Sequence, residues 1–214
     1  MGFTGWPAEA LEFFEGLEAD NTKTYWQANR ALYDTQVKAP MDALLAELAG
    51  EYGPSRVFRP YRDVRFSADK TPYKTNIAAS FESGGYIELS ASGLGAGSGY
   101  WHMASDQLAR FRESVADDVT GGELVGTLKT LQGKGIEAIA IDSLKTAPRG
   151  YPKDHPRIDL LRRKGLAAWR QWPVEPWLGT AKAKDQVVAF LRATEPVRAW
   201  LDTQVGPSSI EYER

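Results

Sequence analysis

The side chains best suited to chemistry are concentrated in residues 56–75. This stretch contains six Lys or Arg and two Asp residues, a net charge of +4. Arginine offers paired, planar donors that match carboxylate and phosphate groups, and lysine adds a compact positive charge. We therefore expect this stretch to bind an anion, through Arg59, Arg62, Arg65, Lys70 and Lys74. The carboxylates of Asp63 and Asp69 are candidate catalytic groups, as a general base or a metal ligand.

A second basic stretch, residues 145–164, contains seven Lys or Arg and two Asp residues, a net charge of +5. Its Arg149 and Lys153 are candidate ligand-binding residues, and His155 is a candidate catalytic proton carrier because histidine titrates near neutral pH. We expect the two basic stretches to adjoin in the fold and to form one positive site on an acidic body. The alternative is that their cations form ordinary surface ion pairs, which stabilise a protein little.

Alternation along the first stretch predicts which of its side chains are buried. If residues 56–67 form a strand, one face carries Arg62 together with Phe58, Val64 and Phe66. The other face is then a candidate binding surface and carries Arg59, Tyr61, Asp63 and Arg65. A guanidinium on an apolar face needs an anionic or carbonyl partner, so we expect Arg62 to be largely buried and paired. Pro60 confines this strand to an edge or a bulge.

The elements that must position these residues belong to an α+β fold with an antiparallel or mixed sheet. Apolar residues at helical spacing predict an N-terminal helical third, in which Pro40 breaks or kinks a helix. Alternation predicts a strand at 85–92, which a glycine-rich connection at 93–99 joins to a strand at 100–103.

The second half of the chain is expected to return to helix. One helix begins at Ser105 or Asp106, and another spans about 121–133. A strand near 139–144, a short helix near 160 and a further strand follow, and Pro196 is expected to start a new helix in a helical C-terminal region. We expect a single domain over residues 1–205 and a flexible tail over 206–214.

Composition narrows the class of protein. No apolar run approaches the ~18 residues that span a membrane, and the start has no secretory pattern. The chain has no cysteine, which excludes disulfides and thiolate chemistry and indicates a reduced, cytoplasmic protein. A net charge of −2 argues against a general nucleic-acid or membrane binder, so the partner we expect is an anionic small molecule.

Other readings compete with the anion site. His102 and His155, each near an aspartate, would suit a divalent metal, but an ordinary surface histidine explains either one, so no metal ligand is assigned. Ser67 and Lys70 match a serine–lysine acyl-transfer pattern whose partner motifs the sequence lacks. A non-catalytic protein-interaction module would use Trp169, Trp172 and Trp177, although core or lid packing is the preferred explanation for them. No cofactor is indicated.

The basic stretches also carry a family resemblance. Residues 62–75 read RDVRFSADKTPYKT, and this string resembles the hallmark of a widespread family of conserved hypothetical proteins, a domain of unknown function. Residues 148–156 read PRGYPKDHP and are similar to a second signature of that family. The resemblance covers about residues 3–203 and implies a single-domain cytoplasmic protein without an assigned activity.

The residues and the resemblance thus select the same two stretches. We expect a protein that binds, or acts on, a phosphorylated or carboxylated small molecule through an Arg/Lys-rich site, with an interaction module as the alternative. The sequence does not specify whether a reaction follows binding, nor the oligomeric state.

Overall fold

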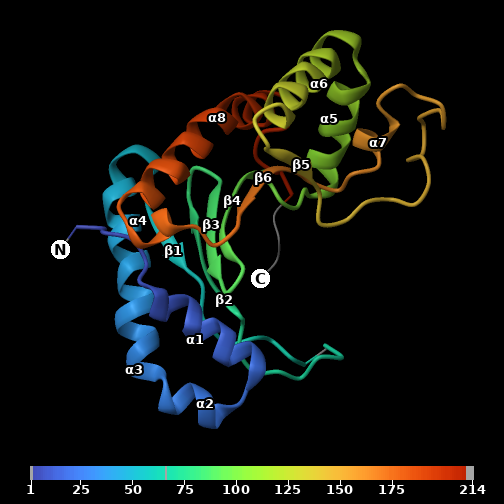
Figure 1. Ribbon diagram of the computed structural model, residues 1–214. Coiled ribbons are helices and arrows are strands. Elements are labelled where there is room, and N and C mark those ends of the chain that lie inside the picture. The colour runs from blue at the N-terminus through green and yellow to red at the C-terminus, as the bar shows by residue number, and fades with distance from the viewer. Residues whose placement is uncertain (1, 66, 211–214) are drawn as a thin grey trace. The chain divides into compact units, whose positions relative to one another are not determined.

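The computed structural model describes residues 2–65 and 67–210 and has an α+β fold (Figure 1). The chain divides into two compact units, which we describe separately. Unit 1 comprises Met1–Ala96 and Gln171–Phe190, and unit 2 comprises Gly97–Arg170 and Leu191–Arg214. The expectation of one domain over residues 1–205 stays a prediction.

Unit 1 opens with two helices that follow the apolar periodicity. Helix α1 (Ala8–Ala19) buries Phe13, Phe14 and Leu17 on one face. Helix α2 (Lys23–Ala28) begins after Thr22, whose side chain accepts a hydrogen bond from the backbone N–H of Tyr25 at 3.2 Å. This cap satisfies one of the free N–H groups at the helix start.

The next helical run differs from the sequence prediction at Pro40. Helix α3 (Arg30–Leu32) leads into a π-helix, η1 (Tyr33–Lys38), and the chain then continues as α4 (Ala39–Tyr52) without a break. Pro40 lies in the first turn of α4. Proline has no N–H and its ring crowds the preceding turn of an α-helix. The wider π-helical turns before it accommodate both defects, so the helix is modified rather than broken.

The strands of unit 1 form an antiparallel arrangement. Strand β1 (Ser55–Val57) pairs with β2 (Asn76–Phe81), and β2 pairs with β3 (Gly85–Ser90). The sequence analysis missed β2 because the turn residues before it masked its short apolar run. The strand expected over 56–67 ends at Val57, and the chain continues as an extended arm. Phe66, which that strand prediction included, lies outside the described residues.

The glycine-rich segment is a strand, which corrects the expected connection at 93–99. Strand β4 (Gly93–Tyr100) follows β3 after a two-residue turn, and the sheet order is β1-β2-β3-β4-β6-β5. Gly93 has a φ of 115°, and a Cβ there would come 2.2 Å from the carbonyl oxygen of Trp172. Glycine is therefore needed for close backbone approach rather than for a loose turn.

Unit 1 is completed by a later part of the chain. The end of β6 (Leu166–Trp172) is followed by a 3₁₀ helix, η2 (Pro176–Gly179), and by the start of α8 (Lys182–Gln204). The backbone N–H of Trp6 donates to the carbonyl of Leu178 at 2.8 Å. Both residues are buried, so this bond fixes the N-terminus to the returning chain.

Unit 2 contains the remaining elements. Helices α5 (Ser105–Ala116) and α6 (Asp118–Gln132) precede strand β5 (Glu137–Ile139), which pairs antiparallel with β6. The short helix α7 (Ile158–Leu161) leads into β6, as the sequence indicated. The core of this unit includes Phe111, Val115, Leu124, Leu161 and Leu166.

Pro196 lies inside helix α8, which corrects the expectation that it starts a new helix. A proline in a helix interior costs about 3 kcal/mol or more. Buried apolar residues on both sides of it, Leu191 and Val197, hold the helix together against this cost.

Residues 206–210, which the sequence analysis assigned to a tail, are hydrogen-bonded within unit 2. The Asp106 carboxylate accepts from the Ser208 hydroxyl and the Ser209 backbone N–H, each at 2.8 Å. Arg110 donates to the carbonyl of Pro207 at 2.7 Å. Within residues 2–65 and 67–210, no helix is long and apolar enough to cross a bilayer.

Candidate anion-binding site

The first basic stretch forms an arm of two extended limbs, within residues 58–65 and 67–75, which we call the basic arm (Figure 1). Three backbone hydrogen bonds join the limbs to each other and to β2. The N–H of Phe58 donates to Ala78 and that of Lys74 to Pro60, both at 2.8 Å, and that of Arg62 donates to Pro72 at 2.9 Å. These bonds fix the backbone from which the arginines project.

The two limbs are unequal in length. Val57 pairs with Ala79, and Tyr61 forms an isolated antiparallel bridge with Tyr73. The two pairs are four positions apart on the first limb, from Val57 to Tyr61, and six positions apart on the second, from Tyr73 to Ala79. The two extra residues form a bulge in the limb that contains Lys74. Bulges bend a strand and re-aim its side chains.

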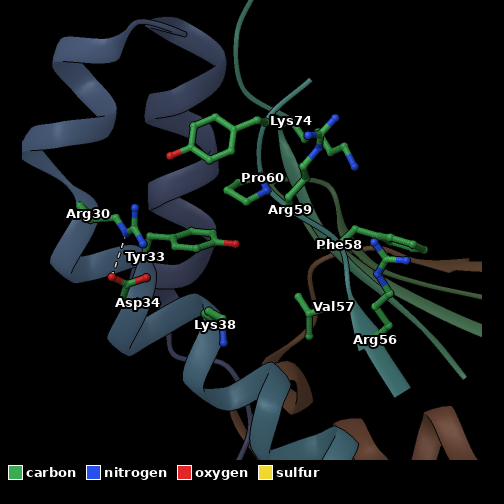
Figure 2. A pocket seen from close by; sticks show the side chains of 11 residues that line it. Arg30, Tyr33, Asp34, Lys38, Arg56, Val57, Phe58, Arg59, Pro60 and Lys74 are labelled. Carbon is green, nitrogen blue, oxygen red and sulfur yellow. Dashed lines mark hydrogen bonds and ion pairs between the residues drawn. The ribbon is translucent and has the colours of Figure 1, made fainter. Parts of the chain in front are cut away.

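A hollow of about 450 Å³ lies in unit 1 between the helical run and the first limb of the arm (Figure 2). Its lining comes from α3, η1, β1 and the arm, and we call it the basic hollow. The residues that line it are Arg30, Tyr33, Asp34, Lys38, Arg56, Val57, Phe58, Arg59, Pro60, Tyr61 and Lys74.

The helical side of the basic hollow contains cations that are already neutralised. Arg30 Nε lies 2.8 Å from the carboxylate of Asp34, one turn along the helix. Lys38 Nζ lies 2.5 Å from the carboxylate of Asp42. Pairs at this spacing are typical of exposed helix surfaces and contribute little each.

The arm side contains cations without carboxylate partners. Among the described residues, none pairs with Arg56, Arg59 or Lys74, and Figure 2 shows all three on this side of the hollow. Burial lowers the pKa of Lys74, and the charge of Arg59 lowers it further. The Lys74 ammonium lies 5.5 Å from the ring centre of Phe58, a cation–π contact. The fold therefore holds two like charges together at this point.

Aromatic residues form much of the remaining wall. Tyr33 is buried, and burial raises its pKa to about 12, so its hydroxyl stays protonated and can donate a hydrogen bond. Tyr61 is 46% exposed. The hollow thus combines unpaired cations with ring surfaces.

Further along the arm, Arg62 is paired as expected but is not largely buried. Its guanidinium donates to the carboxylate of Asp69 and to the hydroxyl of Thr71. The Arg62 side chain is 32% exposed. The strand that was to bury it stops at Val57, so its partner is an aspartate of the arm rather than a core carboxylate.

The two candidate catalytic carboxylates of the arm are held in ion pairs. The pKa of Asp69 is lowered to about 2, most strongly by a hydrogen bond from the Thr71 backbone N–H and next by one from the Arg62 side chain. Asp63 accepts from Arg65 Nε at 2.9 Å and from Nη2 at 2.6 Å, and these bonds lower its pKa. Carboxylates with lowered pKa values are weak bases, so neither is suited to proton abstraction near neutral pH.

The outer cations of the arm do not line the basic hollow. The Arg65 side chain is 76% exposed and forms an ion pair with Asp63. Lys70 Nζ donates to the backbone carbonyl of Val64 at 2.9 Å. Of the cations proposed from this stretch, only Arg59 and Lys74 lie at the basic hollow.

Comparisons with known proteins bear on the family of the chain. A model of a family of conserved hypothetical proteins (DUF2461) matches residues 9–200. The chain belongs to this family. A solved structure of a conserved hypothetical protein from Pyrococcus furiosus is 10% identical, and the match covers 79% of this chain and 95% of that one at a TM-score of 0.38. A search of curated proteins finds no match.

The second basic stretch lies in unit 2, so its meeting with the basic arm stays a prediction. Arg149 and Lys153 are exposed. His155 Nδ1 accepts a hydrogen bond from the backbone N–H of Arg157 at 3.0 Å, which stabilises a local turn. Arg157 has a structural role: it donates to the carbonyls of Val115 and Ala116 at the end of α5.

The competing sequence readings stay predictions. Within residues 2–65 and 67–210, no group of three or more His, Asp or Glu side chains is placed to hold a metal ion. Two of the tryptophans considered for an interaction module make ring contacts inside unit 1: Trp172 lies 6.3 Å from Trp177. In unit 2, Trp169 lies 6.1 Å from Trp101.

The helical side of the basic hollow was missed from the sequence. Arg30, Asp34 and Lys38 recur every four residues, and Tyr33 lies between them. This spacing places the three charged residues on one face of a helix, which is the signal that could have found them. Arg56 was counted in the basic stretch but was not assigned to the site.

Proposed function

We propose that unit 1 binds a small anionic molecule, phosphorylated or carboxylated, in the basic hollow. The observation that supports this proposal is the placement of Arg59 beside Lys74, with neither cation in an ion pair with a carboxylate of the described residues. Like charges held together destabilise a fold, and an anion between them would remove that repulsion. Hydrogen bonds to charged groups are about twice as strong as neutral ones, so the same two residues would also supply affinity.

The proposal is for binding, without an assigned reaction. Asp63 and Asp69 are ionised and paired, and they lie outside the lining of the hollow. Tyr33 is the hollow's protonated hydroxyl and would donate to the bound anion. A fixed donor of this kind orients a ligand without changing its protonation.

Calorimetric titration of the intact protein tests the proposal. The ligands are inorganic phosphate, ribose 5-phosphate, a nucleoside diphosphate, and a mono- and a dicarboxylate. Hydrogen bonds to charged groups contribute roughly 1.5–3 kcal/mol, so Arg59→Ala and Lys74→Ala should each weaken binding roughly 10- to 100-fold. Arg59→Lys keeps the charge but loses the paired donors, so we expect an intermediate affinity.

Arg65→Ala is the matched control. It removes one arginine of the same arm, and Arg65 is exposed and does not line the hollow. We expect it to leave affinity within about twofold of the native value. Equal loss in Arg59→Ala and Arg65→Ala would show a diffuse charge effect and no site. Failure of every anion to bind the folded protein would refute the proposal.

The second basic stretch can be tested in the same titration. If both stretches contact one ligand, as we predict, Arg149→Ala and Lys153→Ala should also weaken binding. Unchanged affinity in both variants would confine the ligand to unit 1 and contradict the shared site, while leaving the basic hollow in place.

A further inference from the structure

The charge of the basic hollow indicates the charge of its ligand. Five cations line it, and two of them, Arg30 and Lys38, are neutralised by aspartates. Arg56, Arg59 and Lys74 are left, and a single carboxylate would neutralise only one of the three. A phosphate monoester or a diphosphate carries two or more negative charges at neutral pH and would match this excess better.

An exposed ring at the same hollow indicates a second part of the ligand. Tyr61 is 46% exposed, whereas its aromatic neighbours Trp26 and Tyr73 are 3% and 5% exposed. The Tyr61 ring centre lies 6.1 Å from that of Trp26 and 5.5 Å from that of Tyr73. Trp26 and Tyr73 are themselves stacked, with ring centres 4.5 Å apart at an angle of 9°. Tyr61 is therefore a ring with a rigid backing and an open surface.

The spacing of the ring and the cation is set by the backbone. Arg59 and Tyr61 are two residues apart on the first limb, which is paired with the second limb at Pro60 and Tyr61. A bend at Pro60 lies between them, and two residues of chain span at most about 7 Å. Both residues line the basic hollow. A ligand that contacts both must therefore carry a ring and an anionic group a few ångströms apart.

We propose that the ligand is a nucleotide, whose base stacks on Tyr61 and whose phosphate chain binds Arg59, Lys74 and Arg56. This inference rests on the proposed function and deepens it by naming the ligand class. Aromatic stacking is tolerant of base identity because every base has a flat π-face, so we expect little preference among bases. Specificity then comes from the ring and the phosphate together.

The first test compares ligands on the native protein by calorimetry. A nucleoside diphosphate is compared with ribose 5-phosphate, inorganic pyrophosphate and the free nucleoside. Base stacking on an aromatic side chain is worth enough to raise affinity roughly tenfold or more, so the nucleotide should bind at least tenfold more tightly than pyrophosphate. The free nucleoside should bind more weakly than either, because it lacks the anion.

The second test separates the ring from the charge. Tyr61→Ala should weaken nucleotide binding roughly tenfold while leaving pyrophosphate affinity unchanged, and Tyr61→Phe should retain both. Arg59→Ala should weaken both ligands equally. Circular dichroism checks that each variant folds. If Tyr61→Ala does not fold, the ligand comparison on the native protein alone tests the nucleotide assignment.

The outcomes distinguish this inference from the function on which it rests. Equal affinity for nucleotide and pyrophosphate would overturn the nucleotide assignment and leave anion binding intact. Absence of binding by every phosphate would overturn the nucleotide assignment, and absence of binding by the carboxylates as well would overturn both. A single-stranded tetranucleotide that binds much more tightly than the mononucleotide would also overturn the assignment, because the occupant would then be a nucleic acid.

Discussion

The side-chain amide of Asn21 pairs with the backbone of Tyr73 as a neighbouring strand would. Asn21 Nδ2 donates to the carbonyl of Tyr73 at 3.1 Å, and the N–H of Tyr73 donates to Asn21 Oδ1 at 3.0 Å. The loop between α1 and α2 therefore holds the second limb of the basic arm at its base. The Tyr73 ring, stacked on Trp26, adds a second attachment to the same helices.

We predict that Asn21→Ala lowers the free energy of unfolding by about 1–3 kcal/mol, because it leaves buried backbone groups of Tyr73 without partners. Urea denaturation measures the change. Asn29→Ala is the control, since the Asn29 side-chain amide makes one bond, to the carbonyl of Tyr25 in helix α2, which Asn29 ends. Equal losses in the two variants would contradict the strand-like role of Asn21.

Asn21→Asp sharpens this test. A carboxylate can accept from the Tyr73 N–H but cannot donate to its carbonyl. We expect the free energy of unfolding of Asn21→Asp to lie between that of the native protein and that of Asn21→Ala, measured in the same denaturation series. Native stability in Asn21→Asp would show that the bond to the carbonyl contributes nothing.

Arg157 is predicted to stabilise unit 2 through the end of α5. Its side chain is 13% exposed, and its guanidinium donates to two backbone carbonyls and to Asp118. Arg157→Ala would leave the carbonyls of Val115 and Ala116 without this donor and should cost roughly 1.5–3 kcal/mol. The measurement is the denaturation midpoint, with exposed Arg149→Ala expected to change it little. A midpoint unchanged by Arg157→Ala would refute the prediction.

Two glycines are predicted to respond in opposite directions to alanine. Gly99 has a φ of 140°, and a Cβ there would come 2.4 Å from the carbonyl oxygen of Leu166. The backbone strain alone costs roughly 1–3 kcal/mol, so Gly99→Ala should lower the melting temperature clearly. Gly122 lies in α6 with no atom within 4 Å of such a Cβ, and Gly122→Ala should gain about 0.5–1 kcal/mol. Thermal unfolding of both variants checks the signs, and a stabilised Gly99→Ala would contradict the close approach.

The hydrogen bonds that Asp69 accepts, first from the Thr71 backbone and then from Arg62, predict an acid-sensitive contribution to stability. The folded pKa of Asp69 is about 2, below its ordinary value of 3.8, so the unfolded chain takes up the proton first as pH falls. The stabilisation is complete above about pH 3.8 and is lost as pH falls through about 2. The stability difference between the native protein and Asp69→Asn should narrow over this range. An NMR titration of the Asp69 carboxyl with its midpoint at 3.8 would contradict the prediction.

The sequence predicted the helices of this fold better than its strands. Phe13, Phe14 and Leu17 are buried at helical spacing because local periodicity alone decides the face of a helix. The strand prediction failed where pairing decides the structure. The glycines of β4 are typical of a loop, yet close approach of a partner strand makes them a strand, and partner strands are invisible in local sequence.

The same distinction applies to the site. Arg59 and Lys74 were predicted because they lie in one basic stretch, and Arg65, which does not line the hollow, was included for the same reason. Alternation along a strand predicted that Arg65 and Arg59 share a face. That prediction requires a continuous strand, whereas β1 ends at Val57. The bulge on the opposite limb changes the register, and only the pairing of Tyr61 with Tyr73 reveals it.

The π-helix between Tyr33 and Lys38 contains one residue more than an α-helix would use for the same rotation. Deleting a single exposed residue there should therefore restore an α-helix while Arg30 and α4 keep their present faces. An insertion cannot be absorbed in the same way, because one further residue rotates a helix by about 100° and would turn Arg30 away from the arm. We therefore expect natural variation in this segment to remove a residue more readily than to add one.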